Sequence, residues 1–133
     1  MIKMGIEFRK EWKASSKPAK QRKYRFNAPM HIKRKFVSSH LSKELREKHG
    51  IRSIVLKKGD TVKIMRGKFK PHSGKVNRVD LKKSKVYVEG ADMTKKDGTK
   101  IFYPLEPSNL LIITLEMDDK KRQKKLARKK LNK

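Results

Sequence analysis

A loop of basic side chains and glycines, residues 66–75, contains the residues of this chain that are best suited to bind an anion. Cationic side chains attract phosphate groups, and glycine lets a backbone turn sharply and come close to a phosphate. An aromatic ring or an imidazole beside the cations can stack on an unpaired base. The loop therefore predicts binding to a nucleic-acid backbone, through Arg66, Gly67, Lys68, Phe69, Lys70, His72, Gly74 and Lys75.

Two groups of residues in this region have a second interpretation that the sequence leaves open. Gly67 and Gly74 are also typical of ordinary turns, and for Gly74 this interpretation is as good as ligand contact. Basic side chains further along, Lys82, Lys83 and Lys85, suit either RNA contact or a solvated hairpin tip.

A second basic segment, residues 10–35, mixes lysine and arginine with scattered aromatic residues. Its composition predicts that it cannot bury enough apolar surface to order itself in solution, so we expect it to order on a partner. Trp12, Tyr24 and Phe26 either stack on bases or anchor the segment against the rest of the protein. Their basic neighbours favour stacking.

Catalytic and metal-binding chemistry has little support in the sequence. No phosphate-loop, dinucleotide, nucleophile-elbow or zinc-protease fingerprint occurs, so we predict no enzyme and no cofactor. The four histidines, at positions 31, 40, 49 and 72, do not share a helix face at metal-ligand spacing, and cysteine is absent. We therefore predict no metal site and no disulfide.

The charge of the chain points to a polyanionic partner. Its 133 residues include 39 Lys plus Arg and 13 Asp plus Glu, which gives a formal net charge of +26. Such a chain repels itself unless a polyanion neutralises it, and nucleic acid is the obvious candidate. The longest apolar run, residues 110–113, is far shorter than the roughly 20 residues that span a bilayer. Residues 1–7 show no secretory signal, so we expect a cytoplasmic protein with no membrane partner and no small-molecule substrate.

Short strands are predicted over residues 54–116, where the apolar period is two. The signals are Val62 with Ile64, Val76, Val86 with Val88, Ile101 with Tyr103, and Leu110 with Ile112. Asp97 and Gly98 predict a hairpin with a type I′ turn. Five short strands predict a mostly β fold, a small closed barrel, because closure removes exposed edges at low cost in residues. We expect this fragment to fold alone, though marginally.

The segments on either side of the predicted barrel have different patterns. Residues 27–53 predict a pair of short helices, with Pro29 in the first turn, Ser39 or Ser42 as an N-cap and Gly50 as a left-handed ending. Residues 117–133 form a basic tail, either disordered or a helix on a polyanion, since Leu126 and Leu131 are too few for an apolar face. We expect neither this tail nor the N-terminal extension, residues 1–26, to pack on the barrel without an anion.

Three stretches in order resemble a known family. "KKGDTVKIMRGKFKPHSGKVNRVD" resembles the KOW motif, and it lies between "NAPMHIKRKFVSSHLSKELREKHGIRS" and "VEGADMTKKDGTKIFYPLEPSNLLIITL". Together they resemble the archaeal and eukaryotic form of large-subunit ribosomal protein twenty-four, called protein twenty-six in eukaryotes. The resemblance implies an SH3-like barrel that binds large-subunit ribosomal RNA near its 5′ end, assists early subunit assembly and lies near the exit of the nascent-peptide tunnel.

The resemblance also implies partners and further contacts. The partners are ribosomal RNA, neighbouring large-subunit proteins and factors at the tunnel exit. Candidate RNA contacts outside the loop are Arg22, Lys23, Arg25, Asn27, His31, Lys33, Arg34, Lys35 and Arg52. For His31, contact with a nucleotide and capping of its own helix both stay open. Pro71 stands where the family commonly has glycine, and its fixed φ predicts a different path for residues 69–73.

A second function also fits a KOW barrel. Similar barrels in transcription elongation factors contact RNA polymerase. Such a module would normally be joined to another domain and would not need a net charge of +26. The two basic extensions favour the ribosomal interpretation.

Overall fold

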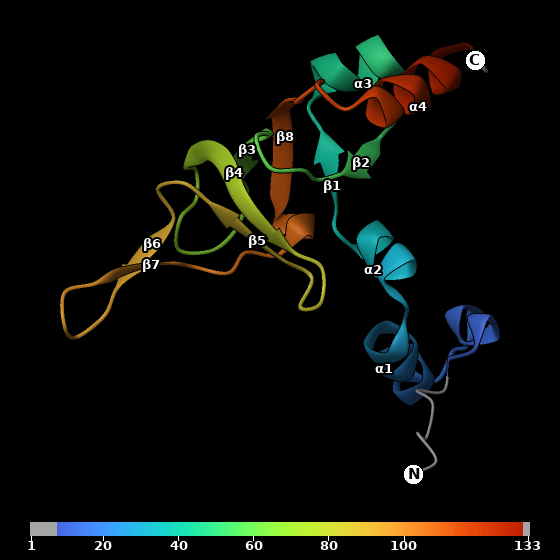
Figure 1. Ribbon diagram of the computed structural model, residues 1–133, viewed down its shortest axis with the longest axis horizontal. Coiled ribbons are helices and arrows are strands. Elements are labelled where there is room, and N and C mark those ends of the chain that lie inside the picture. Colours follow the sequence, from blue (N-terminus) through green and yellow to red (C-terminus); the bar gives the residue numbers. More distant parts are fainter. Residues whose placement is uncertain (1–7, 132–133) are drawn as a thin grey trace.

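The computed structural model describes residues 8–131 of the chain (Figure 1). The expectation that residues 1–7 contain no secretory signal lies outside the described residues. Within residues 8–131 the helices are η1 (Lys10–Ala14), α1 (Pro18–Asn27), α2 (Met30–Phe36), α3 (Lys43–His49), η2 (Pro107–Asn109) and α4 (Lys120–Leu131). The strands are β1 (Ser38–Leu41), β2 (Ser53–Val55), β3 (Thr61–Ile64), β4 (Ser73–Asp80), β5 (Lys85–Val88), β6 (Asp92–Thr94), β7 (Lys100–Phe102) and β8 (Leu110–Thr114).

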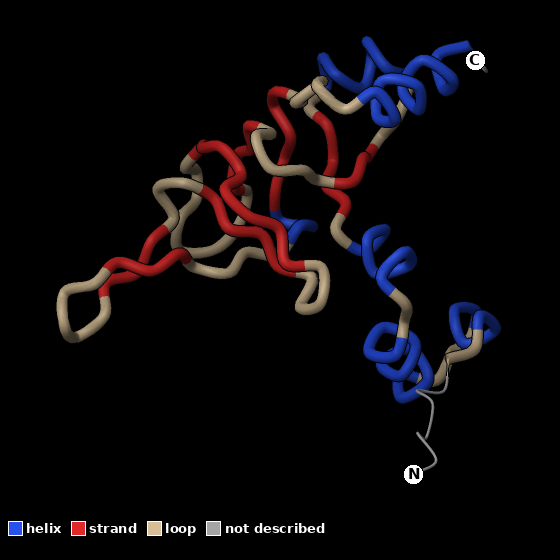
Figure 2. Tube along the Cα trace, in the orientation of Figure 1, coloured by secondary structure: helices blue, strands red, loops and turns tan. Residues whose placement is uncertain are grey.

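Six of these strands form one mixed sheet in the order β2-β1-β8-β3-β4-β5. β1 runs parallel to β8, and the other neighbours are antiparallel. Strands β6 and β7 form a separate hairpin that projects from the sheet (Figure 2). Helices α3 and α4 lie together at one end of the molecule, whereas α2, α1 and η1 continue away from the sheet as an arm (Figure 1).

Alternation along the strands produces the core. Val62 and Ile64 of β3 are buried, and Thr61 and Lys63, which alternate with them, are not. The same pattern buries Val86 and Val88 of β5, and one cluster joins the buried residues of β3, β4, β5 and β8 to Val37, Leu41, Ile54 and Leu126. Burying branched side chains of this kind stabilises the fold by about 1.5–3 kcal/mol each.

The predicted strands are present, but the fold class needs correction. All five strand signals fall on or beside strands, namely β3, β4, β5, β7 and β8. "Mostly β" is wrong, because helices account for about as much of the described chain as strands do. Strands β1, β2 and β6 were not predicted from the sequence. The order of paired strands begins at β2 and ends at β5, so these two are the edge strands of the sheet.

The two predicted short helices are confirmed as α2 and α3. The Ser42 hydroxyl accepts a hydrogen bond from the N–H of Leu45, and Gly50 ends α3 at φ 67°. Pro29 precedes α2 as its N-cap, one position before the first turn. The strand β1 lies between the two helices, and it contains Ser39, the other predicted cap.

The hairpin at Asp97 and Gly98 is also confirmed, but its turn is of another type. The N–H of Gly98 donates to the carbonyl of Lys95, and the N–H of Lys95 donates to the carbonyl of Thr99. Within the described residues, Gly98 is the position of this loop with positive φ, so the type I′ turn is wrong. Five residues connect the strands, with the glycine at the left-handed position that such loops require.

Both basic extensions contain helices, which was not expected of residues 10–35 and was one of the two alternatives for the tail. Residues 10–36 form three helices in which Trp12 and Tyr24 are buried. The tail forms α4, and its Leu126 joins the hydrophobic core while Arg122 is 4% exposed. The prediction that the tail cannot pack without an anion is therefore wrong. The packing of the tail involves Leu126, the buried ion pair of Arg122 and contacts of α4 with α3.

Candidate nucleic-acid interface

Residues 66–75 leave β3 and enter β4, so the sheet positions both ends of the loop. Gly67 has φ 97°, and nothing lies within 4 Å of the place where a Cβ would stand. Backbone bonds from Lys70 to Gly67 and from His72 to Phe69 fold the loop on itself. The Lys70–Pro71 peptide bond is cis. Three cationic side chains of this turn, Arg66, Lys68 and Lys70, are exposed to solvent.

Three other predicted loop residues have partners inside the protein. The ring of Phe69 lies 5.3 Å from that of Tyr103 and packs against the core. The Nε2 of His72 lies 2.9 Å from the carbonyl oxygen of Glu89. A Cβ on Gly74 would stand 2.5 Å from that same oxygen. Glycine is therefore required at position 74 for a structural reason, because it lets β4 pass close to the end of β5.

The aromatic residues of the arm separate into two kinds. Trp12 is buried, with the ammonium groups of Lys20 and Lys23 5.4 and 5.3 Å from its ring centre. The ring of Tyr24 lies between Phe8 and Phe36, at 5.4 and 5.9 Å. Trp12 connects η1 to α1, and Tyr24 connects α1 to α2, so both rings hold the helices of the arm together. Phe26 is different, since it is 83% exposed.

The amide of Gln21 connects η1 to α1. Its Nε2 donates to the carbonyl oxygens of Lys13 and Ser15 at 2.9 and 2.8 Å. These bonds satisfy carbonyls at the end of η1 that have no helical partner. The arm is therefore held by a packed tryptophan and by specific hydrogen bonds.

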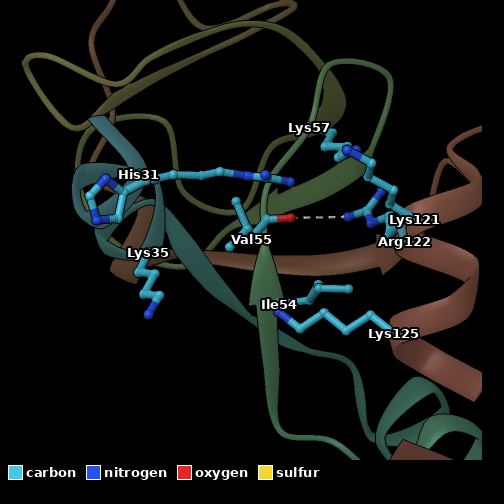
Figure 3. A pocket seen from close by; sticks show the side chains of 9 residues that line it. His31, Lys35, Ile54, Val55, Lys57, Lys121, Arg122 and Lys125 are labelled. Atoms are coloured by element: carbon cyan, nitrogen blue, oxygen red, sulfur yellow. Dashed lines mark hydrogen bonds between the residues drawn. The ribbon is translucent and has the colours of Figure 1, made fainter. Parts of the chain in front are cut away.

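A second group of cations surrounds a cavity of about 300 Å³ between α2, β2 and α4 (Figure 3). We call it the α2–α4 cleft. Its lining residues are His31, Arg34, Lys35, Ile54, Val55, Lys57, Lys121, Arg122 and Lys125. Figure 3 shows His31 and Lys35 on one side of β2 and the three α4 side chains on the other.

A buried ion pair holds α4 against this cleft. The guanidinium of Arg122 donates to both carboxylate oxygens of Asp60, at 2.7 Å each. It also donates to the carbonyls of Glu116 and Val55, at 2.8 and 3.2 Å. Asp60 accepts two further bonds, from the N–H groups of Lys57 and Glu116. A charge pair this buried is tolerated because its polar atoms are so extensively hydrogen-bonded.

The cations of the cleft perturb one another. Burial lowers the pKa of Lys57, and the nearby charges of Arg34, Arg122 and Lys121 lower it further, while Asp60 opposes them. The ammonium of Lys57 also contacts the carboxylate of Asp119. Besides Arg122, five lysine and arginine residues line the cleft, and the carboxylates in contact with its cations are those of Asp60 and Asp119, an excess of positive charge that favours an anion in this place.

Among residues 8–131, none of the helices has both the length and the apolar character of a membrane-spanning helix. Within the same residues, no three His, Asp or Glu side chains gather where a metal ion could be held.

The family of the chain follows from a comparison with known proteins. A model of the family described as ribosomal proteins, L26 in eukaryotes and L24 in archaea, matches residues 15–129. The chain belongs to this family. The match covers the arm from its α1 helix onward, the whole sheet and most of α4.

Membership of the L26/L24 family has plain consequences. The protein is a structural component of the large ribosomal subunit, located in the cytoplasm within the ribosome, and the family is not one of enzymes. Its partners are ribosomal RNA and neighbouring ribosomal proteins. The match gives no support to a transcription elongation module.

In this ribosomal protein the predicted contact residues lie on separate surfaces. The loop 66–75 is near the β6–β7 hairpin, whereas the arm extends on the other side of the sheet (Figure 1). Arg22, Lys23, Arg25 and Asn27 belong to α1, Lys33 to α2, and Arg52 precedes β2. His31, Arg34 and Lys35 line the α2–α4 cleft, and the structure brings them together with residues that were not predicted from the sequence, Lys57, Lys121 and Lys125.

The spacing of the missed lysines is informative only together with the burial that the structure shows, because Lys120 and Lys124 have the same spacing. Lys121 and Lys125 are four residues apart, as are Arg122 and Leu126, which places each pair on one helix face. The second pair is the buried one, so the first lies beside the contact with the sheet.

Proposed function

We propose that the protein binds large-subunit ribosomal RNA near its 5′ end, assists early assembly of the subunit and lies near the nascent-peptide tunnel exit, where factors can reach it. Its family supports a ribosomal role, and the resemblance of its three stretches supports these finer assignments. The observation that carries RNA binding is the presence of exposed cations on two separate surfaces, the loop 66–75 and the arm with its cleft.

The proposed scaffold is an SH3-like barrel with a KOW motif over β3 and β4. Strand β4 is eight residues long and pairs with both β3 and β5. A register shift between Val76 and Arg78, and an isolated bridge between Val86 and Leu105, favour strong bending. These features support a sheet that curls toward closure.

Recognition in this proposal relies on RNA shape. Cations on rigid elements contact phosphates, and phosphates carry no sequence information. Two basic surfaces separated by the sheet fit RNA segments that are distant in sequence and adjacent in a folded RNA. Early assembly suits such a protein, because it would hold those segments together.

A cross-linking map on large-subunit ribosomal RNA tests the function. We expect cross-links from residues of both surfaces to cluster near the 5′ end of the RNA. Cross-links concentrated elsewhere, or copurification with RNA polymerase without large subunits, would contradict the proposal.

Variants test the part played by the loop. Lys68→Ala with Lys70→Ala should weaken RNA binding without changing the melting temperature, because both side chains are exposed. The control, Lys43→Ala with Lys48→Ala on α3, removes the same charge from outside the proposed surfaces. Equal effects of the two variants on affinity would remove the loop from the interface.

A further inference from the structure

We propose that the α2–α4 cleft binds a phosphodiester segment of the RNA backbone, and that α4 is a preformed wall of this site. This inference rests on the proposed RNA binding and adds to it a defined site, with Lys57, Lys121 and Lys125 as contacts. From the sequence, residues of α2 were expected in the interface, and the tail was expected to be either disordered or a helix on a polyanion, with no residue of it named as a contact.

The lining of the cleft has the chemistry of a phosphate site. Of its nine residues, five are lysine or arginine with exposed or half-buried side chains, and Arg122 is held in the ion pair with Asp60. No carboxylate is among these nine residues. Lysine and arginine are the residues that bind backbone phosphates, by charge and by donated hydrogen bonds.

The shape of the cleft fits a nucleotide unit better than a lone ion. Ile54 and Val55 of β2 lie between the cations of α2 and those of α4 and contribute apolar atoms to the floor of the cleft (Figure 3). A sugar ring offers carbon atoms to such a floor, while the phosphates on its two sides reach the flanking cations. A cavity of about 300 Å³ is larger than one phosphate requires.

The wall formed by α4 is in place before any ligand arrives. The buried pair of Arg122 with Asp60 fixes the start of α4, and Leu126 fixes the next turn in the core. Lys121 and Lys125 are adjacent to these two anchors in sequence and are exposed. A site with prepositioned cations loses less conformational entropy on binding than a flexible tail does.

Two further observations concern groups of the cleft that a bound anion would complement. Burial lowers the pKa of Lys57, and the charges of Arg34, Arg122 and Lys121 lower it further. The Nε of Arg122 is buried without a hydrogen-bond partner among the described residues. A bound phosphate would relieve the repulsion between the cations.

The test compares two pairs of lysines on the same helix. Lys121→Ala with Lys125→Ala removes two cations that line the cleft, and Lys120→Ala with Lys124→Ala removes two at the same spacing that do not. RNA affinity is measured as a function of salt for full-length protein. We expect the cleft variant to bind about tenfold more weakly, with a salt slope lower by about 0.7 to 0.9 for each phosphate that it no longer neutralises. The control should stay within about twofold of the unaltered protein.

A second measurement locates the contact directly. Amine acylation of the complex should spare Lys57, Lys121 and Lys125 relative to the free protein, and should modify Lys120 and Lys124 equally in both. Equal weakening of RNA binding in the two variants, or no protection of the cleft lysines, would overturn the site while RNA binding of the unaltered protein stands. Failure of the unaltered protein to bind large-subunit RNA would overturn the proposed function itself.

Discussion

At the scale of the residue, the exposure of Phe26 calls for a physical reason. Its ring is 83% exposed on a helix whose other aromatic residue, Tyr24, is buried. The ring borders a hollow lined also by Ala19, Lys20, Arg22 and Lys23. A large apolar side chain among cations is typical of a platform on which an unpaired base stacks while its phosphates meet the cations.

Replacing Phe26 by alanine tests this role. We expect Phe26→Ala to lower RNA affinity by roughly fivefold to 150-fold, since stacking is worth about 1–3 kcal/mol per base. The melting temperature should not change, because so exposed a ring packs against little of the protein. Filter binding and thermal melting on the same samples would measure both.

Two conservative variants separate stacking from general apolar contact. Phe26→Trp keeps a flat aromatic face and should retain the affinity, whereas Phe26→Leu keeps apolar surface without that face and should not. If leucine binds RNA as well as phenylalanine, a stacked base at this position is ruled out.

The sequence predicted which side chains of the loop are cationic and exposed, but it did not predict which residues contact the rest of the protein. The cations of residues 66–70 are exposed as a binding loop requires. Phe69, His72 and Gly74 instead contact Tyr103 and Glu89, which are distant in the sequence. An aromatic residue in a basic loop has the same sequence pattern whether it stacks on a base or packs on the protein. Only its neighbours in the folded structure decide between the two roles.

At the scale of the element, α4 shows how a highly charged segment can belong to a folded domain. Its pattern predicts no apolar face, and one leucine enters the core. The other anchor is an arginine whose partner, Asp60, is 62 residues earlier. Nothing in the local pattern distinguishes Arg122 from the lysines around it, so the sequence could not predict this packing.

Breaking the ion pair should release the helix. Arg122→Gln leaves the buried carboxylate of Asp60 without its charge partner, and removing one member of such a pair typically costs about 3–5 kcal/mol. We expect a decrease of this size in the free energy of unfolding, measured in urea. Faster amide exchange throughout α4 should accompany it.

The neighbouring lysine provides the control for this variant. Lys121→Gln removes the same charge from an exposed position of the same turn, and such changes usually alter stability by less than about 0.5 kcal/mol. Similar decreases for the two variants would mean that the ion pair does not hold α4 in place.

The strand β1 is the second element that the sequence concealed. It has four residues, and Val37 just before it and Leu41 at its end are four apart, which is also the spacing of a helix face. Short apolar runs do not distinguish the two structures. Residues 38–41 form a strand because they pair with β2 and β8, which both follow later in the chain. The pairing with β8 is parallel.

At the scale of the whole molecule, a sheet with closely attached helices carries a helical arm (Figure 1). The sequence patterns predict a boundary at residue 54 and a fragment, residues 54–116, that folds alone. In the structure β1 lies between β2 and β8 inside the sheet. Val37 and Leu41, both fully buried, precede that boundary, as do the first residue of β2 and all of β1. The helices η1 and α1 of the arm, in contrast, supply no residue to the main core cluster of the described chain.

Two fragments should therefore behave differently. Residues 28–133 retain every strand and α4, so we expect them to unfold cooperatively with a melting temperature close to that of the full chain. Residues 54–116 lack β1 and α4, leave β8 without its parallel neighbour and leave Asp60 without Arg122. The free-energy cost of losing several buried side chains and a buried charge partner exceeds the free energy of unfolding of most small domains. We therefore expect this fragment not to fold. Circular dichroism melting and amide exchange would measure both outcomes.

RNA titration of residues 28–133 then measures what the arm contributes. The fragment lacks the cations of α1 and the exposed ring of Phe26, so its affinity and its salt slope should fall together. The slope should remain well above zero, because the loop 66–75 and the α2–α4 cleft are intact. A fragment that binds as tightly as the full chain would show that the removed part of the arm makes no RNA contact. A salt slope near zero would show that the removed part makes nearly all of the RNA contacts. A remainder that neutralises no phosphate would release no counterions from the RNA.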